Sequence, residues 1–187
     1  MIKGWLNPAS QQVLSPEQLL MHYAKTQDNT SLTLLVEHFN LMLFHYLLTQ
    51  SEQSIAEDVL QNTWLKVINK ASSFQENTSV KSWLFTIARN TLIDELRRLK
   101  RWNYQEIEAN HLMSITLTDK LIGFEQLARF NAVLSQLPFY QREAFILQQE
   151  GCSLAEIADI TNEKTETIKT RLRYAKQNLK KHLEQKL

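Results

Sequence analysis

Hydrophobic residues recur at intervals of three and four through most of the chain, which is the spacing expected of amphipathic helices. In the first third, this spacing predicts a largely buried helix that contains Leu34, Leu35, His38, Leu41, Met42 and Leu48. A following helix is predicted from Val59, Leu60, Trp64, Val67 and Ile68. The polar stretch 72–80 then interrupts the pattern and predicts a loop.

Several helix starts are marked by capping residues. Ser15–Glu17 combines an N-cap serine, a proline for the first turn and an acidic side chain. Ser54–Glu57 and Ser153–Glu156 both have the capping-box pattern, in which serine and glutamate satisfy each other's backbone N–H groups. Pro138 is placed to open a further helix.

The chain divides into two predicted helical modules, because the apolar pattern weakens at 102–123 and returns at Phe124. The sequence has only three Gly and three Pro, and few sheet proteins manage with so few turn residues. We therefore predict an all-α fold with an N-terminal bundle at 12–102, a flexible linker at 103–123 and a C-terminal domain at 124–187.

The C-terminal module has the pattern of a helix-turn-helix. One helix is predicted to end near Glu150–Gly151, a second to span 153–160, and a third to run from 165 to 183 after a tight turn. The third helix is apolar on one face and basic on another, as a DNA-reading helix requires. Its candidate contacts to phosphates or bases are Thr165, Thr167, Lys169, Thr170, Arg171 and Arg173. A helical hairpin with a solvated charged face is the alternative interpretation.

Residues 84–101 form a helix with two unlike faces when they are placed at about 100° per residue. The apolar face contains Leu84, Ala88, Leu92, Leu96 and Leu99. Asn90, Arg97 and Arg101 fall nearly opposite, flanked by Asp94 and Arg98. The basic side chains therefore share a face with an asparagine and turn away from the core.

An acidic and polar ridge is predicted at the start of the preceding helix, from Glu57, Asp58, Gln61 and Asn62. Such a ridge suits a basic protein surface rather than DNA. An ordinary charged helix start is the alternative, because acidic side chains favour a helix N-terminus. Helical spacing assigns core packing, rather than a role in strand melting, to Trp64, Trp83 and Phe85.

Net charge is only +1, but acidic residues dominate 11–62 and basic residues dominate 164–187, which suggests two different partners. Cys152 is the only cysteine, which fits a reducing compartment. No apolar run reaches the roughly 18 residues of a membrane helix, and the N-terminus lacks the apolar centre of a secretory signal. We expect a cytoplasmic protein that is not itself a membrane protein. Histidine and cysteine spacing predicts no metal site, and we expect no cofactor.

Together the two modules resemble the extracytoplasmic-function (ECF) group of bacterial RNA polymerase sigma factors. AEDVLQNTWLKV resembles the helix by which that family binds core polymerase. SFQENTSVKSWLFTIARNTLIDELRRLKR resembles its −10 loop and helix, and LPFYQREAFILQQEGCSLAEIADITNEKTETIKTRLRYAKQNL resembles its −35-binding domain. The resemblance covers nearly the whole chain and implies a subunit that directs promoter recognition and DNA melting, as an alternative sigma factor.

The resemblance also implies partners and roles. The residues that would dock on the clamp helices of the largest polymerase subunit are Glu57, Asp58, Gln61 and Asn62. Those at the −10 element would be Phe74 and Asn90, around a flipped base, and Arg97, Arg98 and Arg101, on nearby phosphates. The third C-terminal helix would read the −35 element, and the linker would thread toward the polymerase active centre. The polymerase flap and an anti-sigma factor are further implied partners, and no small-molecule substrate is implied.

Two positions depart from the family pattern. Thr161-Asn162 replaces the usual Leu-Gly of the turn, and asparagine tolerates the left-handed conformation better than most residues. Lys164–Thr167 lacks the usual serine cap, for which Thr165 is the expected substitute.

Two other functions compete with this interpretation. A stand-alone helix-turn-helix regulator would leave the N-terminal motif unexplained. An enzyme would need a phosphate-binding loop, a nucleophile elbow or metal-ligand spacing, and the sequence has none of these patterns, so we expect no enzyme activity.

Overall fold

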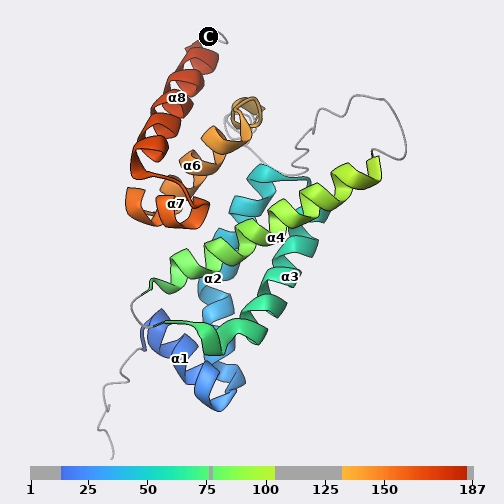
Figure 1. Ribbon diagram of the computed structural model, residues 1–187, viewed down its shortest axis with the longest axis vertical. Helices are drawn as coiled ribbons and strands as arrows, with labels where there is room; N and C mark the ends of the chain where they lie inside the picture. The colour runs from blue at the N-terminus through green and yellow to red at the C-terminus, as the bar shows by residue number, and fades with distance from the viewer. Residues whose placement is uncertain (1–13, 76–77, 104–131, 185–187) are drawn as a thin grey trace, which may run out of the picture.

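The computed structural model describes residues 14–75, 78–103 and 132–184, and within these ranges the regular structure is helical throughout (Figure 1). The N-terminal helices are α1 (Pro16–Thr26), α2 (Asn29–Gln50), α3 (Gln53–Lys70), the short 3₁₀ turn η1 (Ala71–Ser73) and α4 (Val80–Asn103). The C-terminal helices are α6 (Phe139–Gln149), α7 (Leu154–Thr161) and α8 (Thr165–Glu184). The predicted all-α fold with two helical domains is confirmed, and the predicted linker lies outside the described residues except for Asn103.

Most predicted helix starts are confirmed. Ser15 caps α1 in a capping box whose second partner is Gln18, and Pro138 precedes α6. Ser153 caps α7, where the Glu156 carboxylate accepts a hydrogen bond from the Ser153 backbone N–H at 2.8 Å. These side chains satisfy N–H groups that have no partner within the helix.

The capping box predicted at Ser54–Glu57 is wrong. Helix α3 already begins at Gln53, and Glu52 occupies the cap position without a side-chain hydrogen bond. Ser54 therefore lies inside the first turn, where its hydroxyl is not in the cap position. Glu57 instead accepts a hydrogen bond from the Gln53 side chain at 2.8 Å, which is the i,i+4 pairing of residues within a helix.

Helix α2 is the centre of the N-terminal bundle, but the sequence pattern assigned part of its buried face wrongly. Its fully buried apolar side chains are Leu35, Phe39, Leu43, Tyr46 and Leu47. Leu34 is 45% exposed and Leu41 is 74% exposed, although both were predicted to be buried. Because α2 is apolar on most sides, spacing alone does not decide which leucine stripe the neighbouring helices cover.

Helix α2 is also long and apolar enough to cross a membrane by length and composition alone, with a mean hydropathy of 1.2 over its most apolar window. Polar residues such as Glu37, His38 and Asn40 interrupt the window, so it contains no unbroken apolar run. In the structure α2 packs against α1, α3, α4 and α6, and 28% of this window is buried.

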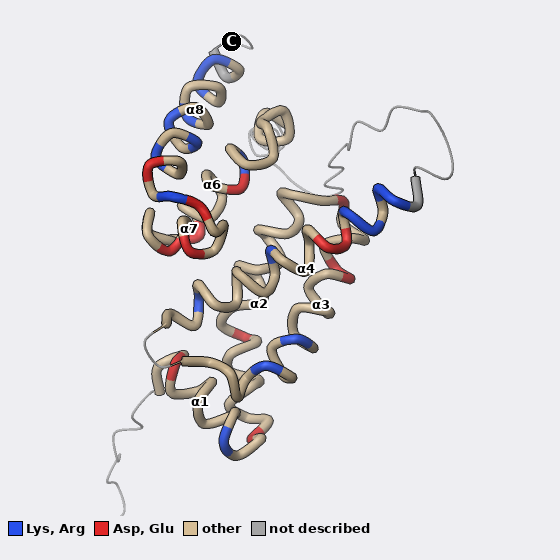
Figure 2. Tube along the Cα trace, viewed as in Figure 1, with Lys and Arg blue, Asp and Glu red and all other residues tan. Residues whose placement is uncertain are grey.

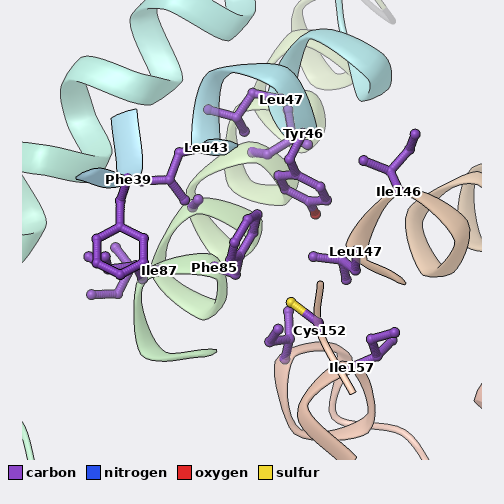
Figure 3. Packing of buried hydrophobic residues seen from close by; sticks show 14 of the residues in the cluster. Phe39, Leu43, Tyr46, Leu47, Phe85, Ile87, Ile146, Leu147, Cys152 and Ile157 are labelled. Carbon is purple, nitrogen blue, oxygen red and sulfur yellow. The ribbon is translucent and has the colours of Figure 1, made fainter. Parts of the chain in front are cut away.

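The two domains pack directly against each other. Helix α6 lies on α2 and α7 lies on α4, while α8 packs on α6 and α7 at the outer side of the molecule (Figure 1). Figure 3 shows Tyr46 and Phe85 of the N-terminal bundle facing Leu147 and Cys152 of the C-terminal domain. One buried apolar cluster therefore runs through both domains.

Candidate nucleic-acid and protein interfaces

The acidic ridge lies exposed at the start of α3, where Glu57, Asp58, Gln61 and Asn62 all face solvent. Two hydrogen bonds hold α3 beneath it. Trp64 Nε1 donates to Asn40 Oδ1 of α2 at 2.9 Å, and Lys66 Nζ donates to Thr91 Oγ1 of α4 at 3.0 Å. The ridge is therefore carried by a helix that is fixed on both sides.

Exposed apolar side chains accompany this ridge. Leu65 of α3 is 52% exposed and Ile68 is 37% exposed, and the exposed Leu34 and Leu41 lie on the adjacent helix α2. Large apolar side chains left in solvent together with charged ones are typical of a protein-binding surface. Leu34 and Leu41 were not expected at this surface, because their spacing predicted that they would be buried.

Helix α4 has the two faces that were predicted. Leu84, Ala88 and Leu92 are buried, whereas Leu96 and Leu99 are half-buried. Asn90, Arg97 and Arg101 are exposed. The basic end of α4 lies beside the acidic start of α3 (Figure 2).

The flanking charges of α4 are partly neutralised within the helix. Arg98 Nε donates to Glu95 at 2.9 Å, and this hydrogen bond holds the pKa of the Glu95 carboxyl below its usual value of 4.5. Arg97 lies 3.9 Å from Asp94, and both side chains are largely exposed. Such exposed pairs contribute little to stability, so these arginines are free to exchange partners.

A cleft of about 440 Å³ connects the ridge with the basic face of α4. Its polar lining comes from both helices and consists of Asn62, Lys66 and Asn69 of α3 and Thr91, Asp94, Glu95, Arg98 and Arg101 of α4. Asn62 therefore borders both the acidic ridge and the basic face, a relationship that sequence spacing does not reveal.

Phe74 lies half-buried beside the N-terminal end of α4. Its ring meets the Trp83 ring edge-on, with the centroids 5.5 Å apart. Trp83 and Asn90 are seven residues apart and Arg101 is a further eleven, so all three fall on one line along the helix. Phe74 also lines a pocket of about 380 Å³ together with residues of α1 and η1.

Core packing is confirmed for the fully buried Phe85, whereas Trp64 and Trp83 are only partly buried against the core.

The helix-turn-helix geometry is present in α7 and α8. Asn162 adopts the left-handed conformation with φ of 53°, as predicted for the turn. Gly151, which follows α6, has φ of 77°. Thr165 is the first residue inside α8 rather than the residue before it, so the expectation that it caps the helix is wrong.

The candidate DNA-reading side chains of α8 fall into two groups. Thr165, Lys169, Thr170 and Arg173 are exposed, and Thr167 is half-buried. Arg171 instead turns toward its own domain, where Nη2 donates to Glu163 at 2.6 Å and the guanidinium lies 4.8 Å from the centre of the Tyr140 ring. The opposite stripe of Ile168, Leu172, Ala175 and Leu179 is buried as predicted. Figure 2 shows basic residues along most of α8.

One further polar group, which no sequence pattern predicted, lies between the domains. Arg89 Nε of α4 donates to Glu143 Oε1 of α6 at 2.8 Å, and Tyr46 of α2 donates to the same oxygen at 3.0 Å. Burial raises the pKa of Tyr46 well above 10, and the Glu143 carboxylate raises it further. The only sequence signal is that Glu143 directly precedes an apolar run.

The described residues contain no group of three or more His, Cys, Asp or Glu side chains that could hold a metal ion. The exposed surfaces carry acidic and apolar groups on α2 and α3, basic groups on α4, and basic groups on α8.

Residues 35–102 match the Sigma-70 region 2 family, and residues 127–179 match the Sigma-70 region 4 family. The ECF RNA polymerase sigma factor EcfG of Rhodopseudomonas palustris (strain TIE-1) is 30% identical over 125 residues, which are 66% of this chain and 68% of EcfG.

Two solved structures share the fold. The sigma factor RpoE of Bartonella quintana, in complex with the anti-sigma factor NepR, is 29% identical with a TM-score of 0.65, over 79% of this chain and 95% of that one. CnrH, in complex with the cytosolic domain of CnrY, is 20% identical with a TM-score of 0.67, over 91% and 98% of the two chains. A stand-alone helix-turn-helix regulator is not favoured, because it leaves the region 2 match unexplained. The chain belongs to the sigma-70 family of RNA polymerase sigma factors, in its extracytoplasmic-function group.

Proposed function

We propose that this sigma factor binds core RNA polymerase through its N-terminal bundle and directs it to a promoter through both domains. The observation that carries the proposal is one side of α4, where the half-buried Phe74–Trp83 pair is followed by the exposed Asn90, Arg97 and Arg101. An aromatic pair followed by an amide and then by guanidinium groups suits a nucleic-acid strand, because bases stack on aromatic rings and phosphates pair with arginine.

The surface proposed for core polymerase consists of the acidic ridge and the exposed leucines beside it. Glu57, Asp58 and Gln61 would meet basic groups on the clamp helices, while Leu65 and Leu41 would lose water at the same contact. Apolar side chains would supply affinity and the acids would orient the partner. Asn62, which lines the cleft toward α4, would lie where polymerase and DNA meet.

The −10 element is proposed to lie along α4. Phe74 and Asn90 would hold a base taken out of the stack, and Arg97, Arg98 and Arg101 would hold the phosphates that follow it. Extruding a base costs a few kcal/mol, which aromatic stacking and hydrogen bonds offset. Support comes from the exposure of Asn90, Arg97 and Arg101 on one side of α4.

The −35 element is proposed to receive α8 in its major groove. Thr165, Thr167, Lys169, Thr170 and Arg173 would make the contacts. We propose that Arg171 contributes indirectly, because Glu163 and Tyr140 already hold its guanidinium. It would fix the turn before α8 and thereby the angle at which α8 enters the groove.

The remaining assignments follow from this role. We propose domain limits of 12–102 and 124–187, with 103–123 as a connection that threads toward the polymerase active centre. We further propose contact of the C-terminal domain with the flap, control by an anti-sigma factor, a cytoplasmic location and no catalytic activity of its own. The family membership and the binding character of the surfaces support these assignments.

Binding to polymerase and to single-stranded −10 DNA tests the proposal. Core polymerase without a sigma factor should retain the purified chain on gel filtration, and the complex should bind a −10 oligonucleotide. Asn90→Ala should weaken oligonucleotide binding about tenfold and leave core binding unchanged, because Asn90 is exposed and outside the ridge. Gln149→Ala, an exposed change on α6, is the matched control. A chain that does not bind core polymerase would contradict the proposal.

A further inference from the structure

A buried ion pair lies in the middle of the contact between the two domains. The Glu143 side chain is fully buried, and the Arg89 side chain is 11% exposed. Arg89 contacts both carboxylate oxygens, through Nε at 2.8 Å and Nη2 at 3.4 Å. Tyr46 adds a third hydrogen bond, and its ring meets Phe85 edge-on. Three helices, α2, α4 and α6, thus contribute one side chain each to a satisfied polar triad.

Weaker polar contacts surround this triad at the edge of the interface. Ser82 of α4 donates to Glu156 of α7 at 3.2 Å, and His45 of α2 lies 3.2 Å from Glu150. Arg142 of α6 donates to Gln50 of α2, also at 3.2 Å. The interface therefore has an apolar and ionic centre with a hydrogen-bonded rim, which is the organisation of a specific protein interface.

Given the proposed function, the chain in this closed arrangement cannot bind the −10 and −35 elements at the same time. The −10 and −35 elements are about 25 base pairs apart by their names, or roughly 85 Å at 3.4 Å per base pair. A helical domain the size of residues 132–184 is about 25–30 Å across, so α8 stays within that distance of α4 while α7 touches α4. DNA this short is too stiff to fold back.

The domains must therefore separate before both elements are bound. The connection at 104–131 has 28 residues, which can span at most about 100 Å whatever their conformation. Separation breaks the Arg89–Glu143 pair and exposes the side of α4 that α7 covers.

A buried ion pair suits an interface that has to open. Closing the interface removes two charges from water, and this desolvation penalty offsets much of the attraction between them. Opening the interface hydrates both charges again. Removing only one partner should leave an uncompensated charge in the closed state and favour opening. Replacing the whole triad by apolar side chains of similar size should instead keep the domains closed.

We propose that Tyr46, Arg89 and Glu143 form an autoinhibitory latch that holds the two domains together and keeps the free chain from engaging core polymerase and promoter DNA with both domains at once. The latch lowers apparent affinity for polymerase, because only the open fraction is competent to bind in the extended form. Release of the latch is therefore a step that a regulator of this chain can control.

The single native cysteine reports on opening. Cys152 is buried in the cluster between the domains (Figure 3). Burial raises its pKa from 9.0 to about 11, so roughly 100-fold less of the thiol is in the reactive thiolate form at neutral pH. Separation of α4 from α7 should hydrate this thiol and speed its reaction with a disulfide reagent, while small-angle X-ray scattering should report a larger radius of gyration.

The variants are Glu143→Gln, Arg89→Met, and the apolar triple change Tyr46→Phe, Arg89→Met and Glu143→Leu. Each single variant of the ion pair should label at least tenfold faster than the native chain and become more extended. The triple variant should label no faster than the native chain. Asp159→Asn, an exposed charge removal on α7, is the control and should leave both measurements unchanged.

Circular dichroism separates opening from unfolding, because an opened chain keeps its helices. If either single variant loses its helical signal, Tyr46→Phe is tested in its place. This variant removes only one hydrogen bond, so its labelling rate and radius of gyration should increase by a smaller amount. Folded single variants with native labelling rates and native scattering would overturn the latch.

Affinity for core polymerase tests whether the latch inhibits polymerase binding. The single variants should bind more tightly than the native chain, and the triple variant no more tightly. Faster labelling without this order of affinities would overturn the autoinhibitory role. If neither the native chain nor any variant binds polymerase, the proposed function fails. Labelling and scattering still decide whether the latch exists.

Discussion

The guanidinium of Arg171 donates a hydrogen bond to Glu163 at 2.6 Å and thereby links the DNA-reading helix to the turn that precedes it. Arg173, two residues further, is exposed. These neighbours consequently have different expected roles, although the sequence pattern grouped them together.

The salt dependence of −35 binding separates the two arginines. Arg173→Ala should reduce the slope of log affinity against log salt by about one, because one phosphate contact is lost. Arg171→Ala should leave the slope unchanged and destabilise the domain by about 1 kcal/mol through the lost cation–π contact and ion pair. Duplex titrations at several salt concentrations and thermal unfolding give the two quantities. A reduced slope in Arg171→Ala would place that residue on the DNA instead.

Asn162 carries the turn of the helix-turn-helix in a left-handed conformation, with φ of 53°. Asn162→Val should destabilise the chain by about 1–2 kcal/mol, because a β-branched side chain clashes in this conformation. Asn162→Gly should be stable to within a few tenths of a kcal/mol of the native chain and is the matched control. Urea denaturation measures both, and equal stability of the valine variant would show that the turn adopts another conformation in solution.

Asp58 is expected to orient core polymerase rather than DNA. Asp58→Ala should weaken core binding several-fold, whereas affinity for a −35 duplex should not change. Glu52→Ala removes another exposed acid just before the same helix and should leave core binding near its native value. Equal losses in the two variants would indicate a general charge effect instead of a defined contact.

The contact between His45 and Glu150 should make domain closure depend modestly on pH. The hydrogen bond to Glu150 raises the pKa of His45 above 6.5, against an opposing effect of burial. This contact therefore stabilises the closed form below about pH 6.5, and the stabilisation is lost as pH rises through the raised pKa. Burial alone would raise the pKa of Glu156, but hydrogen bonds from Ser153 and Ser82 hold it below 4.5, so it stays ionised over this range.

X-ray scattering at pH 6 and pH 8 measures this effect. The native chain should be slightly more extended at the higher pH, and His45→Gln should remove most of the difference. The change should be small because the His45 side chain is 69% exposed. A native chain that becomes more compact at pH 8 would contradict the assignment.

Local features of the fold could be predicted from sequence because their causes lie within a few residues. The Ser153–Glu156 capping box and the left-handed Asn162 depend only on neighbouring backbone groups. The two faces of α4 follow from a clear separation of leucines and arginines. Helix α2 resisted the same reasoning, since its leucines occupy several sides and only the neighbouring helices determine that Leu43 is buried and Leu41 exposed.

The latch could not be predicted, because it joins residues that are distant in sequence. Arg89 and Glu143 are 54 positions apart, and each lies in a segment that was interpreted by its own helical pattern. A buried charge can be identified only when its partner is known, and that partner depends on how the two domains pack.

Transcription by sigma-free core polymerase tests the central claim most directly. The purified chain, core polymerase and pooled genomic fragments are incubated with nucleotides, and the 5′ ends of the transcripts are mapped. We predict transcripts that begin at defined positions downstream of a shared pair of sequence elements, and their loss in a variant that combines Asp58→Ala with Asn90→Ala. Transcripts that begin at the same scattered positions with and without the chain would contradict the account.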